Sequence, residues 1–449
     1  MIKQTKKLFH LLKFNNNGSN KFQVFSSVLY LTTLPSYSFG EIKNLKQPSK
    51  DSEYLAKIKI KFQEAENFLR KPNHLDEAIK RYQDILYSFN LGKEIKSCDC
   101  IKALIGIGDA YTLQKKMDKS LDYYLLALAF KPLECPEVER AELHRKIGEC
   151  YYEIAEFIDS LEYSQKALDL YKSCNFDDSL TIGKIYLYLG RNYNKINDLY
   201  QAIENFKVAQ DIFFTNEQNI HLIIQTKTEL AQALAVRKEI WTSWTTLFEA
   251  MTLYEQSPDL TLAEKITLTE EFTKVLDILS FYRELLERYE DLIKLLRQQN
   301  GRQPSEKVTD VLTNIAFTHV RLKDYPSAIS AYLEALDEAE TLDIPTVKSD
   351  IYLQVGICFW TESDYDEAKE YLVKAVETKK NCVSPKCPEI GKAYYYIGRI
   401  YYSEYDYERS QRCFAKALRI LRKCNEEDDE DILEIQKYLN KSRQKLGDD

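Results

Sequence analysis

The sequence predicts an all-α chain, an α-solenoid of about nine helix hairpins that ends in a capping helix. Two observations indicate this fold. A series of small and bulky residues recurs along most of the chain with a period of about forty residues. No run of alternating apolar and polar residues, the pattern of an amphipathic strand, interrupts it. With 449 residues and 44% apolar composition, the chain is long enough to bury one extended core.

The stretch from 104 to 132 shows the repeating unit. Counted from its small anchor residue, an aromatic residue follows at position 3, small residues at 12 and 19, a second aromatic at 16 and a proline at 24. These residues are Gly108, Tyr111, Ser120, Tyr124, Ala127 and Pro132. The offsets predict two antiparallel helices joined by a tight turn, with small residues where the backbones approach and bulky residues filling the seam.

The same series recurs six more times along the chain. Its anchors are Gly148, Gly190, Ala231, Ala316, Gly356 and Gly398. A first, less regular copy runs through Ala65, Ala78, Tyr82 and Ile85, and a degenerate copy runs through Phe272, Leu276, Leu285, Tyr289 and Leu292. Together the copies predict nine hairpins. We expect neighbouring hairpins to share a continuous core, because one hairpin cannot bury its own apolar stripe.

This series, with its trailing proline, resembles the tetratricopeptide repeat over residues 51–422. The resemblance implies a right-handed superhelix whose inner groove receives a peptide or a partner helix. Successive anchors lie 40 to 42 residues apart, whereas the commonest repeat has about 34 residues. The chain therefore resembles the longer repeats of kinesin light chains and related adaptors. The last copy, CPEIGKAYYYIGRIYY, shares their Pro-acidic-apolar entry to the first helix.

Four segments follow from this pattern. The first is a basic N-terminal segment, targeting-like or disordered, at residues 1–40. The array follows in two parts, an N-terminal part at residues 51–299 and a C-terminal part at residues 305–422. The last segment is a capping helix with an acidic start, at residues 426–445. The joint between the two parts is the strongest helix breaker of the array, the run Asn300-Gly301-Arg302-Gln303-Pro304. Six aspartates are predicted to lie in the turns within hairpins, where aspartate can cap a helix. They are Asp76, Asp118, Asp159, Asp198, Asp324 and Asp364.

The N-terminal segment has the features of an organelle presequence. Residues 2–14 place Leu8, Phe9 and Leu12 on one side of a helix and most lysines on the other. Serines are frequent and no acid precedes Glu41, although arginine is missing. The alternatives are a disordered basic tail and a secretory signal whose apolar core is 22–34, a stretch too short and polar to cross a bilayer. We therefore predict a mitochondrial location, with the cytoplasm or a cilium as the alternative.

The charge distribution argues against nucleic acid as the main ligand. The net charge is −8, and the first 40 residues hold five lysines and no acid, so the rest of the chain carries −13. Binding to phosphates needs a basic surface. The ten cysteines lie within helical repeats, which indicates free thiols in a reducing compartment more than a disulfide framework.

The sequence contains no recognisable motif for catalysis or metal binding. P-loop, nucleophile-elbow and HExxH motifs are missing, and the five histidines are scattered. Two isolated cysteine pairs, Cys98 with Cys100 and Cys382 with Cys387, offer too few ligands for a four-ligand zinc site. We therefore predict a protein that is not an enzyme and has no catalytic, cofactor-binding or metal-binding residues.

The candidate partner-binding residues lie beside the anchors. In a helix, the positions three before, one after and four after an anchor share one stripe, which by the resemblance lines the groove. In the N-terminal part, the stripe and the helix turn before it hold basic and amide residues that can bind a carboxylate-bearing segment of a partner. These residues are Arg145, Lys184, Arg191 and Asn194. In the C-terminal part the stripe suits an apolar or aromatic anchor, through Phe317, Trp360, Tyr395, Arg399 and Tyr402. The alternative is that these side chains pack on neighbouring helices or meet only water.

These observations predict a non-catalytic scaffold that mediates protein–protein interactions within a larger complex, in mitochondria if the N-terminal segment is a presequence. The alternative is a cytoplasmic or ciliary (axonemal) adaptor that binds peptides or motor-associated partners. The clamp by which cochaperones of the family hold a C-terminal carboxylate is not reproduced, because Tyr188 and Ile105 stand where basic or amide groups are needed. The partner and the oligomeric state do not follow from the sequence.

Overall fold

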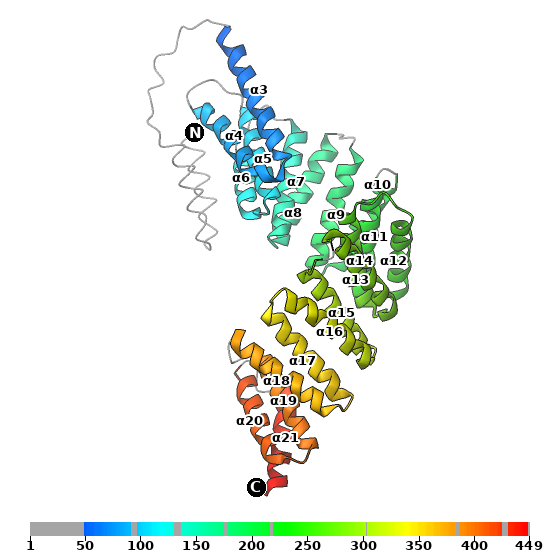
Figure 1. The fold of residues 1–449 in the computed structure, drawn as a ribbon. Helices are drawn as coiled ribbons and strands as arrows, with labels where there is room; N and C mark the ends of the chain where they lie inside the picture. The colour runs from blue at the N-terminus through cyan, green and yellow to red at the C-terminus, as the bar shows by residue number, and fades with distance from the viewer. Residues whose placement is uncertain are drawn as a thin grey trace. The chain divides into compact units, whose positions relative to one another are not determined.

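The computed structural model describes residues 49–90, 97–129, 136–174, 178–215, 219–301, 303–382, 387–423 and 430–447. Within these ranges there are nineteen α-helices and no strand (Figure 1). The chain forms two units, Met1–Asn216 and Glu217–Asp449. The predicted targeting segment, 1–40, lies outside the described residues. The prediction of an all-α solenoid is confirmed.

The first unit contains four helix hairpins, each made of two consecutive helices. They are α3 (Ser49–Leu69) with α4 (Leu75–Asn90), α5 (Ser97–Leu113) with α6 (Met117–Ala129), α7 (Glu137–Glu153) with α8 (Phe157–Ser173), and α9 (Ser179–Lys195) with α10 (Leu199–Thr215). A short 3-10 helix, Pro72–His74, joins α3 to α4. Each predicted anchor lies near the middle or end of the first helix of its pair.

The second unit contains five hairpins and a final helix, which follow one another in chain order from green to red in Figure 1. They are α11 (Ile220–Val236) with α12 (Ile240–Glu255), α13 (Leu262–Leu279) with α14 (Tyr282–Gln299), α15 (Glu306–Arg321) with α16 (Tyr325–Thr341), α17 (Pro345–Thr361) with α18 (Tyr365–Cys382), α19 (Pro388–Ser403) with α20 (Tyr407–Leu421), and α21 (Glu430–Leu446). The two units together therefore hold the nine predicted hairpins and the capping helix.

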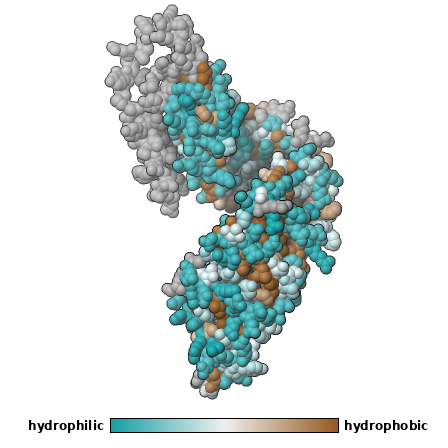
Figure 2. Space-filling view, viewed as in Figure 1, coloured by the Kyte–Doolittle hydropathy of each residue, from teal (hydrophilic) through white to brown (hydrophobic). Residues whose placement is uncertain are grey.

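Neighbouring hairpins within a unit share their apolar cores. In the first unit, Leu104 of α5, Leu121 of α6 and Ile147 of α7 belong to one buried cluster. Leu168 of α8 and Ile185 of α9 belong to the next, which also includes a residue of α7. The surface seen in Figure 2 is mainly hydrophilic, with smaller apolar patches. Among the described helices, none has the length and apolar character needed to cross a bilayer.

The two helices of each hairpin cross where the anchor residue lies. A Cβ atom added to Gly108 would lie 2.3 Å from the ring of Tyr124, and one added to Gly398 would lie 2.8 Å from the ring of Phe414. Both rings come from position 16 of the repeat. The anchors must therefore be small, because a buried aromatic ring occupies the space that a side chain would need.

Hydrogen bonds reinforce four of these crossings. The small residue at position 12 is a serine in these hairpins, and its hydroxyl donates to the carbonyl oxygen of the anchor at 2.7–3.0 Å. The four pairs are Ser120 with Gly108, Ser160 with Gly148, Ser243 with Ala231, and Ser410 with Gly398. Serine at this position is thus both small enough for the crossing and hydrogen-bonded across it.

Eight hairpin turns contain a left-handed residue that is not glycine. In the seven regular hairpins it lies seven positions after the anchor, and in the degenerate one it is Ser280, directly after α13; its φ is between 58° and 68° in all eight. These residues are Lys115, Ala155, Asn197, Lys238, Ser280, Lys323, Ser363 and Tyr405. In each turn the next N–H donates to the carbonyl oxygen five residues earlier, as from Glu156 to Tyr151 at 2.9 Å. This bond, with a second from the left-handed residue, forms the Schellman motif that ends the first helix.

The predicted aspartate caps are only partly found. Asp198 accepts a hydrogen bond from the N–H of Gln201 at 3.2 Å, and Asp324 accepts one from Ser327 at 3.3 Å. Asp364 directly precedes α18. Asp118 and Asp159, by contrast, lie inside the first turns of α6 and α8, as Asp76 does in α4, because those helices begin before them. There the carboxylate faces the positive helix end without capping it.

The predicted joint at 299–305 lies inside the second unit. Leu292 and Leu296 of α14 belong to the same buried cluster as Val308 and Leu312 of α15. Asn300 and Gly301 end one hairpin, and Ser305 caps α15 by accepting a hydrogen bond from Val308. The division between the two units falls instead between Asn216 and Glu217.

We predict that Gly190→Val destabilises the hairpin of α9 and α10. A Cβ atom at Gly190 would lie 2.6 Å from the ring of Phe206, which is fully buried and cannot move freely. The free energy of unfolding should fall by about 1–3 kcal/mol. Urea denaturation followed by circular dichroism measures this change.

Gly301→Asn is the control for this substitution. Nothing lies within 4 Å of a Cβ atom added to Gly301, and asparagine tolerates its positive φ of 60°. The control should leave the unfolding midpoint unchanged. A Gly190→Val protein that unfolds like the control would show that this crossing accepts a side chain.

Candidate functional site

The candidate site residues lie on the first helices of the hairpins, on the positions three before, one after and four after each anchor. We call these positions the A-helix stripe. In the first unit the stripe contains Arg145 and Glu149 of α7 and Arg191 of α9. In the second unit it contains Trp360 of α17 and Arg399 of α19. The surroundings of the stripe residues differ between the two units.

Arg145 is held by two carboxylates of its own helix. Its Nε and Nη2 donate to Glu142 at 2.8 and 2.6 Å, and its Nη1 donates to Glu149. Burial opposes the charge of Arg145, but Glu142 and Glu149 outweigh it and raise its pKa. Burial raises the pKa of Glu149, whereas the hydrogen bond and charge of Arg145 lower that of Glu142 in spite of burial. The guanidinium that was predicted to receive a carboxylate is thus already paired.

Of the other predicted residues of the first unit, only Arg191 is shown in contact with the half-buried Tyr188. The guanidinium of Arg191 lies 5.1 Å from the ring centre of Tyr188, whose ring also meets that of Tyr152 edge-on at 5.8 Å. Burial, with smaller effects from Glu149 and other neighbouring charges, raises the pKa of Tyr188 to about 12. Lys184 and Asn194 are half-buried on α9. The predicted carboxylate-binding set therefore contains a paired cation and a cation stacked on tyrosine.

We predict that Arg145→Leu destabilises the first unit in a pH-dependent way. The substitution leaves the carboxylates of Glu142 and Glu149 without their cation, which should cost about 1–3 kcal/mol near pH 7. The lowered pKa of Glu142 contributes stability above its ordinary pKa, and that contribution is lost as the pH falls through the lower folded pKa. Protonation of Glu149 at low pH also removes the energetic cost of burying its charge. The difference between the melting temperatures of wild type and variant should therefore be largest near neutral pH and disappear as the pH falls below 4.5, the ordinary pKa of a glutamate.

Arg412→Leu is the matched control, because Arg412 pairs with Glu408 at four residues' distance on the surface of α20. The side chains of Arg412 and Glu408 are both well exposed, so the loss of this ion pair should change the stability of the protein little at any pH. Equal melting-temperature losses in the two variants would contradict a structural role for Arg145.

In the second unit, Arg399 lies at the centre of an aromatic cluster. Its guanidinium carbon lies 4.1 Å from the ring centre of Tyr438 on α21 and 5.0 Å from that of Trp360. Its Nη1 donates to the hydroxyl of Tyr395 at 2.6 Å and to Glu434 at 3.3 Å. Burial raises the pKa of Tyr395, although Arg399 acts against the rise. Aromatic rings, a tyrosine hydroxyl and a carboxylate together hold the arginine in place.

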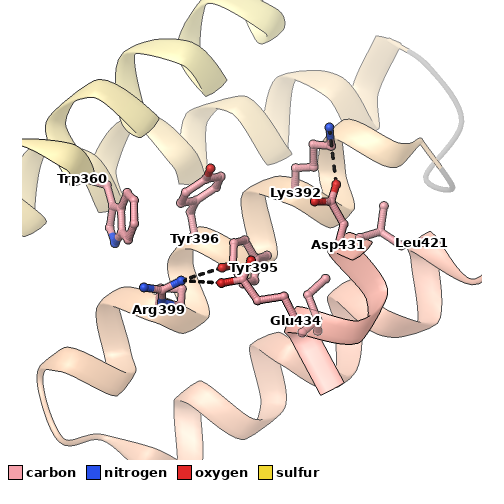
Figure 3. A pocket seen from close by; sticks show the side chains of 9 residues that line it. Trp360, Lys392, Tyr395, Tyr396, Arg399, Leu421, Asp431 and Glu434 are labelled. Carbon is pink, nitrogen blue, oxygen red and sulfur yellow. Dashed lines mark hydrogen bonds and ion pairs between the residues drawn. The ribbon is translucent and has the colours of Figure 1, made fainter. Parts of the chain in front are cut away.

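A pocket of about 270 Å³ opens beside Arg399, between α17, α19 and α21 (Figure 3). Its lining residues are Trp360, Lys392, Tyr395, Tyr396, Arg399, Leu421, Asp431, Glu434 and Ile435. The rings of Trp360 and Tyr396 meet edge to face at 5.0 Å. Lys392 of α19 pairs with Asp431 of α21 at 3.7 Å, in the same way as Arg399 pairs with Glu434. The pocket therefore has aromatic walls and two ion pairs.

The structure brings three of the five predicted aromatic-site residues to this pocket, namely Trp360, Tyr395 and Arg399. Tyr402 packs against Tyr438 of α21 at 5.7 Å and is thereby in contact with the capping helix. Phe317 lies on α15, is 47% exposed and is covered on one side by Arg321 at 4.7 Å.

Sequence reasoning missed Lys392, Tyr396 and the acidic residues of α21 in the pocket. Tyr396 lies in the run Tyr394-Tyr395-Tyr396, which signals an aromatic cluster without saying which ring faces the stripe. The contribution of Asp431 and Glu434 depends on α21 lying along α19, which no local pattern reveals. Sequence reasoning also passed over Trp241, which is 80% exposed on α12 and lies off the stripe.

No cofactor or metal chemistry is evident at the site. Within the ranges that the structure describes, no three His, Cys, Asp or Glu side chains gather closely enough to hold a metal ion. The six cysteines whose side chains are described are free thiols: Cys100, Cys150, Cys174, Cys358, Cys387 and Cys413. What the pocket offers is apolar contact, hydrogen bonds and charge.

The model of the tetratricopeptide repeat family matches residues 347–423, which include α18, α19, α20 and most of α17. Response regulator aspartate phosphatase H of Bacillus subtilis (strain 168) is 26% identical over 99 residues, 22% of this chain and 26% of that protein. This chain thus matches about a quarter of the length of that relative.

Two solved structures share the fold. A signal transduction ATPase of Pyrococcus horikoshii with a tetratricopeptide repeat sensor has a TM-score of 0.54 at 17% identity, covering 80% of this chain and 51% of that one. The apo form of RapI has a TM-score of 0.52 at 11% identity, covering 82% and 98%. At these identities the likeness concerns the fold alone.

Proposed function

We propose that this chain is a non-catalytic scaffold of the tetratricopeptide repeat kind, which holds a partner polypeptide on the A-helix stripe of its second unit. The match of the family model to residues 347–423 and the all-α hairpin fold support this proposal. The pocket between α17, α19 and α21 carries this proposal. Three of its nine lining residues, Trp360, Tyr395 and Arg399, lie on the predicted stripe, and the pocket combines aromatic and apolar side chains with hydrogen-bonding and charged groups. Such concave, mostly apolar sites with a few polar groups are where proteins bind side chains and small ligands.

The exposed ring of Phe317 supports a longer contact along the same stripe. Phe317 lies one position after its anchor on α15, as Ile357 does on α17 and Arg399 does on α19. Arg321, which stacks on Phe317, is fixed from its other side by Asp277 at 2.6 Å. An interface typically has a few aromatic or arginine side chains that contribute most of the binding energy. Phe317 and Trp360 are the residues that suit this role.

We predict that Trp360→Ala weakens the capture of the partner by about 2 kcal/mol or more. The wild-type chain and the variant, each tagged in its native cells, are compared by affinity purification with quantitative mass spectrometry. A partner of the A-helix stripe should be depleted in the variant. Circular dichroism and a melting curve check that the variant is folded.

Trp241→Ala is the matched control, because it removes the same side chain from an exposed position off the stripe. The proposed partner should be captured equally by this control and by the wild type. A set of captured proteins that is indifferent to Trp360→Ala would refute the proposed role of the pocket.

We further propose that the scaffold works in mitochondria, on the basis of the basic, serine-containing N-terminal sequence. Deleting residues 1–40 from a chain tagged at its C-terminus should move it out of mitochondria in fluorescence microscopy. The same distribution before and after the deletion would refute this location and favour the cytoplasmic or ciliary adaptor.

A further inference from the structure

We propose that the pocket receives one neutral aromatic side chain of the partner, a tyrosine or a tryptophan, and that the C-terminal helix α21 selects it. This inference rests on the proposed function of the A-helix stripe and adds the chemistry of the group that enters. The argument depends on the size of the pocket, the pairing of its charges and the acceptors on α21.

The size of the pocket limits the ligand to a single side chain. Its volume of about 270 Å³ is just below the range of about 300–1,000 Å³ in which drug-sized ligands bind. Five of its nine lining residues are apolar or aromatic, namely Trp360, Tyr395, Tyr396, Leu421 and Ile435, and the other four are charged. Aromatic rings bury the most apolar area and pair favourably with other rings edge to face. A partner ring can therefore add to the contact that Trp360 and Tyr396 already make (Figure 3).

The charges of the pocket favour a neutral ligand. Both cations are on α19 and both anions are on α21, and each cation faces an anion: Lys392 with Asp431 at 3.7 Å and Arg399 with Glu434 at 3.3 Å. A charged ligand group would have to compete with one of these residues for its partner and would also meet a like charge nearby. A neutral ring enters without breaking either pair.

The carboxylates on α21 favour a ring that carries a hydrogen-bond donor. The side chains of Asp431 and Glu434 are 52% and 48% exposed. An ionised carboxylate can accept about four hydrogen bonds, so Glu434 can accept one from a ligand in addition to its ion pair. The hydroxyl of tyrosine and the indole N–H of tryptophan provide such a donor, whereas phenylalanine has none.

The helix that carries these acceptors is fixed by its own core contacts. Ile432 and Ile435 of α21 are fully buried, and Leu439 is nearly so. The ring centre of Tyr438, one turn after Ile435, lies 4.1 Å from the guanidinium carbon of Arg399. The wall formed by α21 is therefore in place before a ligand arrives. The helix predicted only as a cap at the open end of the array is part of the binding site.

Fluorine NMR of the full chain labelled with 5-fluorotryptophan tests this inference. The chain has three tryptophans, and Trp360→Phe assigns the resonance of Trp360. N-acetyl-L-tyrosinamide and N-acetyl-L-tryptophanamide should shift that resonance saturably, with dissociation constants of about 1–10 mM. N-acetyl-L-phenylalaninamide should bind about three- to tenfold more weakly, the effect of one hydrogen bond. N-acetyl-L-lysinamide should leave the resonance unchanged.

Glu434→Gln tests the part played by α21. It retains the shape of the side chain but removes the charge that makes the carboxylate a strong acceptor, so the preference for tyrosine over phenylalanine should fall about threefold or more. Glu408→Gln, on the exposed surface of α20, is the control and should retain the preference. An unchanged preference in Glu434→Gln would overturn the selecting role of α21.

Binding of the lysine amide as tight as that of the tyrosine amide, or no shift with any aromatic amide, would overturn the whole inference. These results are separable from those of the proposed function. If no aromatic amide binds but Trp360→Ala still loses the partner, the scaffold proposal stands and this inference fails. If the tyrosine amide binds but Trp360→Ala captures the same proteins, the pocket stands and the scaffold proposal fails.

Discussion

The close crossing of two helices in each hairpin is the contact on which the rest of the structure depends. At Gly108, Gly190 and Gly398 the space that a side chain would occupy is filled by an aromatic ring of the facing helix. Because the crossing sets the distance and angle between the two helices, it also sets which residues of the first helix face away from the hairpin. The A-helix stripe follows from this geometry, since its positions are fixed relative to the anchor.

The pocket arises where α21 packs on the hairpin of α19 and α20. Helix α21 buries Ile432 and Ile435 in one cluster with Phe414 and Leu418 of α20. Its acidic side chains then face the basic side chains of α19 across two ion pairs. In the first unit, Arg145 is paired with Glu142 and Glu149 of its own helix. The two predicted sites therefore differ, because the arginine of the first is held by carboxylates of its own helix, whereas Arg399 lies beside a pocket.

The hairpins could be predicted from sequence because only small residues fit where the two helices cross, and these small residues recur at a fixed spacing along the chain. The turns could not be predicted as well, since their left-handed residue is a lysine, an alanine or a tyrosine as readily as an asparagine. The caps at Asp118 and Asp159 were misplaced for a related reason, because helix starts shift by a few residues without changing the spacing of the anchors.

The candidate site was predictable only where it depends on single helices. Trp360 and Arg399 lie on the stripe because of their distance from an anchor in their own helix. The pairing of Arg145 with Glu142 and Glu149 follows the three- and four-residue spacing and could have been read from sequence. The wall formed by Asp431 and Glu434 depends on how α21 packs on α19, a contact between segments that the chain pattern does not encode locally.

The left-handed turns also bear on how the protein is made. A residue with a side chain loses about 1–2 kcal/mol in this conformation, so a single hairpin emerging from the ribosome carries that strain before its neighbour exists to compensate for it. Docking of the next hairpin provides the buried apolar area that offsets it. The growing end of each unit should therefore stay loosely formed during synthesis and become ordered one hairpin behind the ribosome.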